Sequence, residues 1–243
     1  MQIISLIARL LDYPRDELME NGEVILALIK DAPLPDAEGQ ALLAFAQKRL
    51  SGELLDWQEE YDGLFERGRS LSLLIYEHIH GESRDRGQAM VELQRQYQAA
   101  GLAIAAHELP DYLPLFLEFA ATQGNEASGW LRDIAPVLGL LAVRLDKRQS
   151  NYGALFHALL ALSQAELDLG ELAQQVATEK ADNTPKALDK VWEEEAVIFG
   201  GDAINGGCPS AANRPSEGQR RDQDLPIEFI DAASRPQAAI RSL

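Results

Sequence analysis

The sequence has few of the residues that most often build disulfides or metal sites. Cys208 is its single cysteine, which excludes an intrachain disulfide and a cysteine metal cage and fits a reducing compartment. Zinc-protease spacing is missing, because Asp111 stands four residues after His107 where a second histidine is needed. Glu77-x-x-His80 supplies one half of a ferritin-like di-iron site, and no second half is present. We therefore expect no metal site.

Basic residues are also scarce. Lys and Arg number 22 against 39 Asp and Glu, which gives a formal net charge of −17. Nucleic acids and membrane surfaces are themselves anionic and would repel such a chain. We expect no nucleic-acid partner, and partners that are cationic peptides, neutral surfaces or other proteins.

Long apolar runs are missing as well. The longest, Ile134–Val143, is interrupted by Pro136 and Gly139, whereas a membrane span needs roughly 20 apolar residues. The apolar N-terminal stretch carries Arg9 midway and lacks the basic start and cleavage site of a secretory signal. We expect a soluble chain that does not insert into a membrane.

Motifs of catalysis are missing too. The chain has no glycine-rich loop of the kind that cradles phosphates. The string GESRDRG at 81–87 lacks the G-x-S-x-G spacing of a nucleophile elbow. Pairs of carboxylates are expected by chance in so acidic a chain. The sequence therefore predicts a protein that is not an enzyme.

What the sequence does contain is a succession of amphipathic helices separated by short turns rich in Pro, Gly and Asn. Alternating β-branched runs are missing, and the Ala, Leu, Gln and Glu content favours helix. The fold class expected is all-α, with one bundle-like domain over residues 1–199. The apolar spacing predicts helices over 16–30, 36–51, 53–66, 86–100, 110–123, 128–147 (kinked or restarted at Pro136), 151–166, 170–181 and 185–199.

Residues 200–243 differ from the rest in composition. They hold five Gly and four Pro, and their one compact apolar patch is the string LPIEFI at 225–230. Such a stretch buries too little apolar surface to offset its ordering entropy. We expect a flexible C-terminal tail.

Residues 57–119 combine aromatic, acidic and basic residues within otherwise apolar helices. Three strings stand out: WQEEYDGLFERGR at 57–69, EHIHGESRDRGQAM at 77–90 and HELPDYLPLFLEF at 107–119. One interpretation is an intramolecular network in which residues such as Arg84, Asp85 and Arg86 form ion pairs that hold helix ends together.

The same strings closely resemble the nitrate reductase molybdenum cofactor assembly chaperones, also called the nitrate reductase delta subunit family. The resemblance covers about residues 1–199, including the string DNTPKALDKVWEEEAVIF at 182–199. Tyr112 departs from the pattern, because relatives commonly have His in a Pro-Asp-His triplet. That difference puts in doubt any role that needs an imidazole at this position.

The resemblance implies a cytoplasmic, all-helical chaperone with no permanently bound cofactor. Its client would be the apo catalytic (alpha) subunit of a membrane-bound nitrate reductase, recognised through the N-terminal segment. The chaperone would assist insertion of bis-molybdopterin guanine dinucleotide and an iron–sulfur cluster before membrane assembly, and would not belong to the final enzyme. Molybdenum cofactor biosynthesis proteins are implied as further partners.

The expected mechanism is binding of an amphipathic client helix in a groove between helices. The alternative for the aromatic residues is that they are simply core. The groove floor would be formed by Tyr61, Leu64, Phe65, Leu113 and Phe116, the rim by the acids Asp62, Glu108, Asp111 and Glu118, and neighbouring contacts by His78, His80, Arg84, Arg86, Met90 and Tyr112.

Two other functions stay open at this point. One is a constitutive structural subunit of a redox complex, which would remain with the active enzyme at fixed stoichiometry. The other is a metal-dependent helical enzyme, which the incomplete ligand set disfavours.

Overall fold

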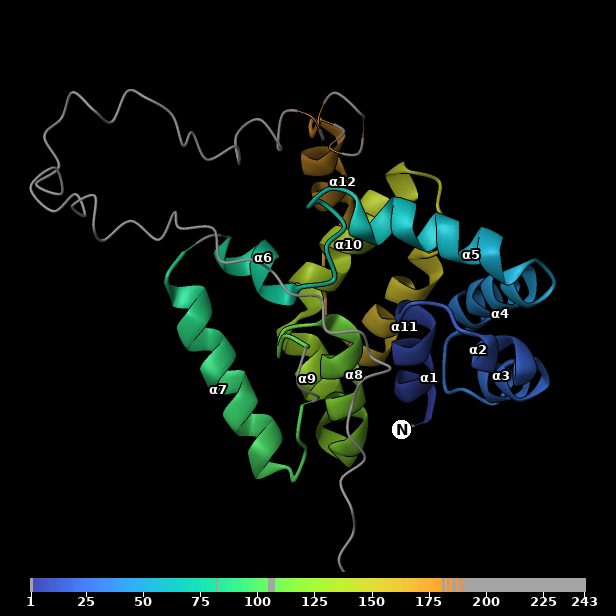
Figure 1. The fold of residues 1–243 in the computed structure, drawn as a ribbon, viewed down its shortest axis with the longest axis horizontal. Coiled ribbons are helices and arrows are strands. Elements are labelled where there is room, and N and C mark those ends of the chain that lie inside the picture. Colours follow the sequence, from blue (N-terminus) through green and yellow to red (C-terminus); the bar gives the residue numbers. More distant parts are fainter. Residues whose placement is uncertain are drawn as a thin grey trace, which may run out of the picture. The chain divides into compact units, whose positions relative to one another are not determined.

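The computed structural model describes residues 2–81, 83–104, 108–180, 182, 184, 187 and 189, which all belong to one compact unit. Every element in these ranges is helical, so the all-α prediction is confirmed (Figure 1). The predicted tail 200–243 and most of the predicted helix 185–199 lie outside the described residues, and the domain boundary stays a prediction.

Twelve α-helices and two short helices of other types lie in the described ranges. They are α1 (Gln2–Leu11), α2 (Asp16–Glu20), α3 (Gly22–Lys30), α4 (Asp36–Leu50), α5 (Leu54–Tyr61), the π-helical η1 (Asp62–Glu66), α6 (Ile75–His80), α7 (Asp85–Ala99), α8 (Leu113–Thr122), the 3-10 helix η2 (Gly124–Glu126), α9 (Ala127–Asp133), α10 (Ala135–Lys147), α11 (Gly153–Ser163) and α12 (Leu169–Ala177). None of them is long and apolar enough to cross a membrane.

Several helix boundaries follow from the sequence signals. The helix α7 ends before Gly101, whose φ of +78° suits a residue without a Cβ. The predicted break near Pro136 is confirmed, because α9 ends at Asp133 and α10 begins at Ala135 with the proline in its first turn. Two predicted helices are interrupted: 16–30 breaks at Asn21, and 53–66 changes to π-helix after Tyr61.

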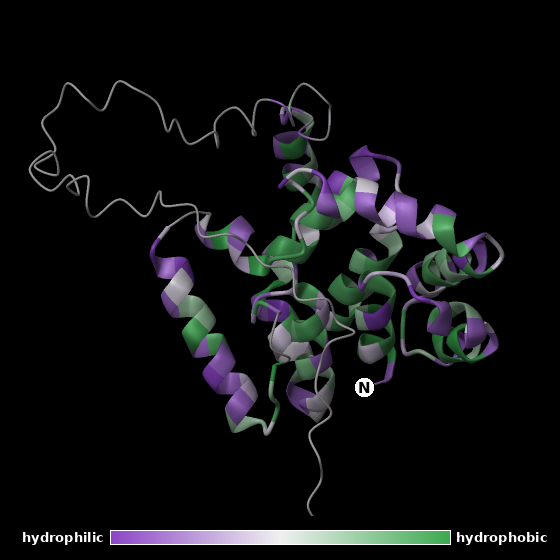
Figure 2. Ribbon diagram, viewed as in Figure 1, coloured by the Kyte–Doolittle hydropathy of each residue, from purple (hydrophilic) through white to green (hydrophobic). Residues whose placement is uncertain are grey.

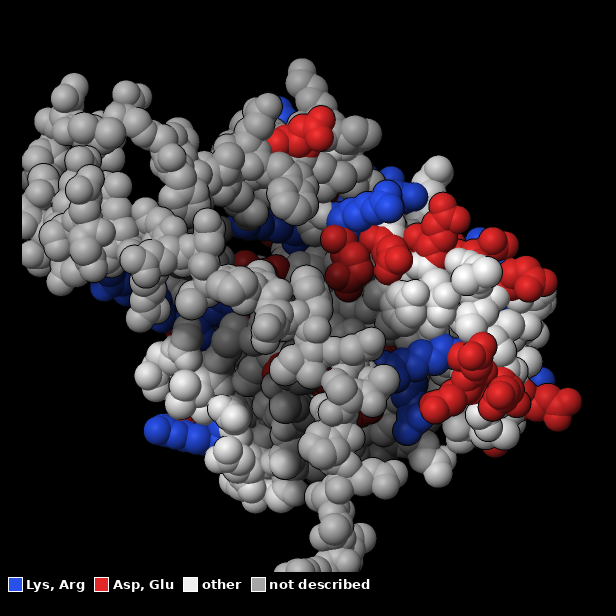
Figure 3. Space-filling view, in the orientation of Figure 1, with Lys and Arg blue, Asp and Glu red and all other residues white. Residues whose placement is uncertain are grey.

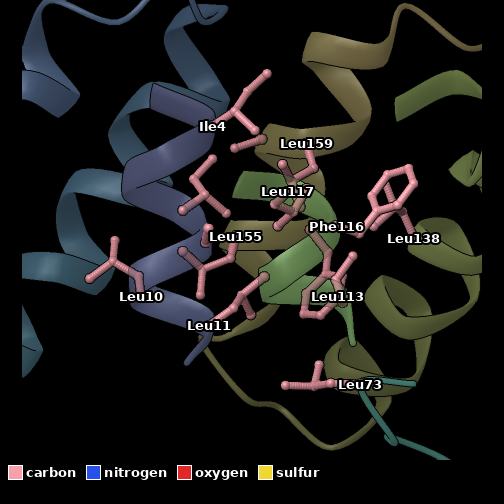
Figure 4. Close-up of a cluster of buried hydrophobic side chains, with 14 of the residues drawn as sticks. Ile4, Leu10, Leu11, Leu73, Leu113, Phe116, Leu117, Leu138, Leu155 and Leu159 are labelled. Atoms are coloured by element: carbon pink, nitrogen blue, oxygen red, sulfur yellow. The ribbon is translucent and has the colours of Figure 1, made fainter. Parts of the chain in front are cut away.

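The core lies where α1 packs against α8 and where α11 packs against α9 and α10. Side chains of α1, α8, α10 and α11 point toward one another in this cluster (Figure 4). The N-terminal stretch is thus a central core helix, and α8 and α11 are among the most hydrophobic ribbons, whereas α7 is largely hydrophilic (Figure 2). Burial of such apolar faces, at about 25 cal/mol per Å², is the main stabilising contribution to this fold.

A second part of the core is aromatic and joins α4, α5 and α11. The rings of Phe45, Phe65 and Tyr152 pack edge to face at centroid distances of 5.0 Å. The indole of Trp57 donates a hydrogen bond of 2.6 Å to the Tyr152 hydroxyl, so the buried polar atoms of this cluster are paired. This cluster holds α5, and therefore the first of the three motif strings, against the rest of the core.

Candidate functional site

The segment just before the second motif string meets the third motif string at the starts of α6 and α8. Leu74 and Tyr112 form an isolated antiparallel bridge. The amide of Leu113 donates to the Leu73 carbonyl at 2.8 Å, and the amide of Ile75 donates to the Asp111 carbonyl at 2.9 Å. Segments more than 30 residues apart in the chain are therefore held together by backbone hydrogen bonds.

Asp111 lies inside this junction, which corrects the expectation that it is an exposed rim acid. Its exposed fraction is 0%, and its Oδ2 accepts a hydrogen bond of 3.1 Å from the amide of Tyr76 in the first turn of α6. Arg86 Nη2 lies 3.7 Å from the same oxygen. Burial raises the pKa of Asp111, while the Tyr76 amide and the Arg86 charge oppose that rise. The residue holds α6 in place and offers no charge to a partner.

Arg86 confirms in part the intramolecular network considered for the second string. Its Nη1 also contacts Glu77 Oε1 at 3.2 Å, so one guanidinium joins α6, α7 and the Asp111 loop. Arg84, by contrast, is exposed at the start of α7, and Met90 is half-buried further along that helix.

The two histidines of the second string point to different surroundings. His78 is partly buried, with Nε2 2.8 Å from the Ser72 carbonyl and Nδ1 3.4 Å from Arg144. Burial and the Arg144 charge lower the pKa of His78, which favours the neutral ring. The His80 ring packs against Tyr76 at 5.4 Å. Within the described ranges, no group of three or more His, Cys, Asp or Glu residues is placed to hold a metal ion.

The first and third strings meet through two tyrosine hydroxyls. Tyr61 and Tyr112 place their oxygens 3.3 Å apart. Tyr61 donates to the Leu11 carbonyl at 3.2 Å, and Tyr112 donates to Asp12 Oδ1 at 3.0 Å. Burial raises the pKa of both hydroxyls far above the ordinary value, so both stay protonated and neutral. The expected proximity of the two strings is confirmed, and both anchor to the C-terminal end of α1.

The predicted groove floor is core. The aromatic residues Tyr61, Phe65 and Phe116 are buried, as is Leu113, which Figure 4 shows among core side chains together with Phe116. Leu64 is half-buried and packs against the same core. The alternative that these aromatic residues belong to the core is therefore correct, and a client helix has no access to them in this conformation.

Two of the remaining predicted rim acids reach solvent and lie on different helices. Glu118 is exposed on α8, and Asp62 is half-buried at the start of η1. Glu108 is exposed just before the buried Asp111 and lines a surface groove next to the tyrosine pair. Of the predicted site residues that the structure describes, Glu108 alone contributes to this groove.

This groove has a volume of about 510 Å³ and lies between α1, α2 and α3. Two apolar side chains at its surface are unusually exposed, Tyr13 at 39% and Val24 at 57%. We call it the α1–α3 groove. Its lining consists of Leu6, Arg9, Asp12, Tyr13, Arg15, Glu17, Leu18, Asn21, Val24, Ile25, Leu28 and Glu108.

The groove connects to the motif strings through two adjacent residues. Asp12 accepts the hydrogen bond from Tyr112, and the Tyr13 ring packs edge to face on Tyr61 at 5.6 Å. Tyr61 and Tyr112, which the sequence placed in the binding site, therefore lie beneath the groove and contact its lining residues. They hold Asp12 and Tyr13, which line the open surface.

Both signs of charge surround the apolar part of the groove. Arg9 and Arg15 line it together with the acids Asp12, Glu17 and Glu108. Acidic side chains gather over α5 and over the α2–α3 region on the face drawn in Figure 3. An apolar strip bordered by charges suits an amphipathic helix, because apolar burial gives affinity and the charges fix register.

Sequence reasoning missed most of the groove. The available signal was the string LLDYPRDELMENGEVI at 10–25, where a turn with an exposed aromatic residue follows the apolar helix α1. A turn tyrosine followed by Pro is common on protein surfaces, so this signal was weak without the α1–α3 packing.

Comparison with known proteins identifies the family. Residues 31–158 match the family described as nitrate reductase delta subunit. The chain is 46% identical over 211 residues to the nitrate reductase molybdenum cofactor assembly chaperone NarJ of Escherichia coli (strain K12), covering 86% of this chain and 88% of that protein. The chain belongs to the nitrate reductase delta subunit family.

Two further relatives carry the same description marked as probable. NarW of Escherichia coli (strain K12) is 43% identical over 238 residues, covering 96% of this chain and 98% of that protein. NarJ of Bacillus subtilis (strain 168) is 33% identical over 162 residues, covering 65% of this chain and 85% of that protein. Both are named probable nitrate reductase molybdenum cofactor assembly chaperones.

Proposed function

We propose that this protein is a cytoplasmic chaperone for the catalytic subunit of a membrane-bound nitrate reductase, and that it binds the N-terminal segment of the apo subunit as a helix. It assists insertion of bis-molybdopterin guanine dinucleotide and an iron–sulfur cluster, and it leaves before the enzyme docks on the membrane. It catalyses no reaction itself. The names of the relatives support the chaperone role, and the α1–α3 groove supports the mode of binding.

The observation that carries the binding mode is the exposure of Tyr13 and Val24 above an apolar floor. The floor includes the buried Ile25 and the half-buried Leu18 and Leu28. Burying roughly 500 Å² of apolar client surface at about 25 cal/mol per Å² supplies ~12 kcal/mol before costs. Ordering the peptide and losing its freedom consume much of this, which leaves an affinity weak enough for release.

The charges of the groove set which segments it accepts. Because Arg9 and Arg15 line the groove together with Asp12 and Glu108, it favours a client helix that carries charges of both signs beside its apolar face. A uniformly acidic competitor meets the overall charge of −17 and is disfavoured.

The chaperone role is tested by co-purification of the tagged full-length chain. In cells blocked in molybdenum cofactor synthesis, we expect the complex with the apo catalytic subunit to accumulate. In cells with intact synthesis, active enzyme purified from membranes should lack the chain. Finding it there at fixed stoichiometry would establish the structural-subunit alternative and contradict the proposal.

A further inference from the structure

A row of basic residues on α10 holds the segment that follows α12. Arg144 donates two hydrogen bonds to Glu179, at 2.9 Å to Oε2 and 2.6 Å to Oε1, in a bidentate pair. Lys147 donates to the carbonyls of Val176 at 2.6 Å and Glu179 at 3.0 Å. Four hydrogen bonds from two basic residues thus bind the end of α12 and the segment after it in a strongly acidic protein.

The carboxylate of Asp182 accepts more hydrogen bonds than that of Glu179. Its Oδ2 accepts from the Ser70 amide at 2.7 Å, and its Oδ1 accepts from the Ser70 hydroxyl at 2.8 Å and from Arg148 Nη2 at 2.8 Å. Burial acts to raise the pKa of Asp182, but the Ser70 hydrogen bonds and the Arg148 charge hold it below its ordinary value. The cradle therefore binds an ionised carboxylate.

Gly68 makes room for this carboxylate. Its φ is +87°, and a Cβ at this position would lie 2.7 Å from Asp182 Oδ2. The turn at the end of the first motif string therefore leaves room for a carboxylate oxygen.

The cradle also has unused binding capacity. A cavity of about 460 Å³ remains beside the bound segment, lined in part by Ser70, Arg144 and Arg148. Arg148 Nη1 is buried without a hydrogen-bond partner among the described residues. A buried guanidinium donor left unpaired is costly, and an acidic segment that is not tethered to α12 can shift so that one of its oxygens satisfies this donor.

We propose that Ser70, Arg144 and Arg148 form a receptor for an acidic segment of a partner protein, with Glu179 and Asp182 of this chain as the resident internal ligand. The partner segment carries two carboxylates three residues apart, as the internal ligand does. This receptor is separate from the α1–α3 groove, shares no lining residue with it, and does not depend on what the groove binds.

Competition between the two ligands determines when the receptor is open. The internal ligand is tethered next to its site, so its effective concentration is in the millimolar range and an external segment of similar affinity is outcompeted. Removing the two internal carboxylates should therefore raise the apparent affinity for an external segment by about tenfold or more.

The test titrates the full-length chain with a synthetic peptide that has the sequence of residues 177–184. Binding is followed through the NMR signal of the Ser70 amide. In the double variant Glu179→Gln/Asp182→Asn, we expect faster exchange of this amide and saturation at a peptide concentration at least tenfold lower than for the wild type. A peptide with Gln and Asn at the two acidic positions serves as the control and should not bind. Equal saturation of wild type and variant, or equal binding of the control peptide, would overturn the proposal.

Gly68→Ala separates opening of the receptor from ligand binding. The added Cβ displaces Asp182, so the Ser70 amide should again exchange faster, but the same Cβ blocks an external carboxylate. We expect no saturation with the peptide in this variant. Peptide binding as tight as in the double variant would show that the Ser70 cradle is not the receptor.

Discussion

The hydroxyl of Tyr112 donates a hydrogen bond of 3.0 Å to Asp12 Oδ1, and this contact ties the start of α8 to the end of α1. Asp12 is at the same time part of the α1–α3 groove. The motif string that includes Tyr112 therefore contributes to the binding surface indirectly, by positioning the groove residue Asp12. This role needs a hydroxyl donor at position 112 and does not need a titratable imidazole.

Replacing Tyr112 with Phe tests this positioning role. The change removes the hydrogen bond to Asp12 and the longer contact with the Tyr61 hydroxyl but little volume, so we expect a loss of about 1 kcal/mol in the free energy of unfolding. Asp12 also loses its partner at the groove, so binding of a client peptide should weaken several-fold. Denaturant melts and calorimetric titration measure the two effects.

Tyr97→Phe is the matched control for that substitution. Tyr97 is a buried tyrosine on α7 whose hydroxyl donates to the Pro110 carbonyl at 2.8 Å, and it does not line the groove. It should lose similar stability and bind the peptide normally. Equal loss of binding in both variants would argue against a specific role for the contact between Tyr112 and Asp12.

The buried position of Asp111 predicts a structural phenotype. Asp111→Ala leaves the Tyr76 amide without its acceptor and removes the carboxylate from Arg86, which should cost about 1–3 kcal/mol of stability. Glu118→Ala, on the exposed side of α8, should change stability by no more than about 0.5 kcal/mol. Chemical denaturation of both variants checks this. An unchanged free energy of unfolding in Asp111→Ala would mean that the junction between α6 and α8 does not depend on the carboxylate.

The pH dependence of stability should reveal the same group. Because the folded state raises the pKa of Asp111, it keeps the proton over a range in which the unfolded chain has lost it. The contribution of Asp111 to the free energy of unfolding therefore falls as pH rises from about 4 through its folded pKa. Denaturant melts between pH 3.5 and 7 should show this slope in the wild type and not in Asp111→Asn.

His78 should make the free energy of unfolding change with pH in the opposite direction to Asp111, and at higher pH. Its folded pKa is lowered, chiefly by burial, so the unfolded chain binds a proton more readily. Stability should therefore be lost as pH falls below about 6.5 toward the folded pKa. The variant His78→Gln should lack this dependence. A wild-type profile that is flat from pH 7 to 5.5 would contradict the buried, neutral placement of the ring.

Local signals in the sequence predict much of the fold. The spacing of Met90, Leu93 and Tyr97 with Gly101 behind them predicts α7 to within one residue at each end. The break at Pro136 also follows from a local rule. These features depend on periodicity and on the backbone preferences of single residues, which are readable without knowledge of packing.

The site is less predictable because it depends on contacts between distant segments. Asp111 reads as a surface acid, and only its backbone pairing with the start of α6 shows why it is buried. Tyr61 and Phe65 share a helical face, but periodicity cannot tell a core face from a binding face. The exposure of Val24 follows from how α3 packs on α4 and α1, which no local pattern encodes.

The α1–α3 groove is tested most directly by calorimetric titration of the full-length chain with a synthetic peptide of the N-terminal segment of the nitrate reductase catalytic subunit. Val24→Asp places a charge on the apolar strip, and Leu55→Asp is the matched control on α5, where the leucine is 77% exposed and outside the groove. Both substitutions replace an exposed apolar side chain, so both variants should stay folded. We expect micromolar or tighter binding by the wild type and by Leu55→Asp, and at least tenfold weaker binding by Val24→Asp. Unchanged binding by Val24→Asp would contradict the placement of the client in this groove.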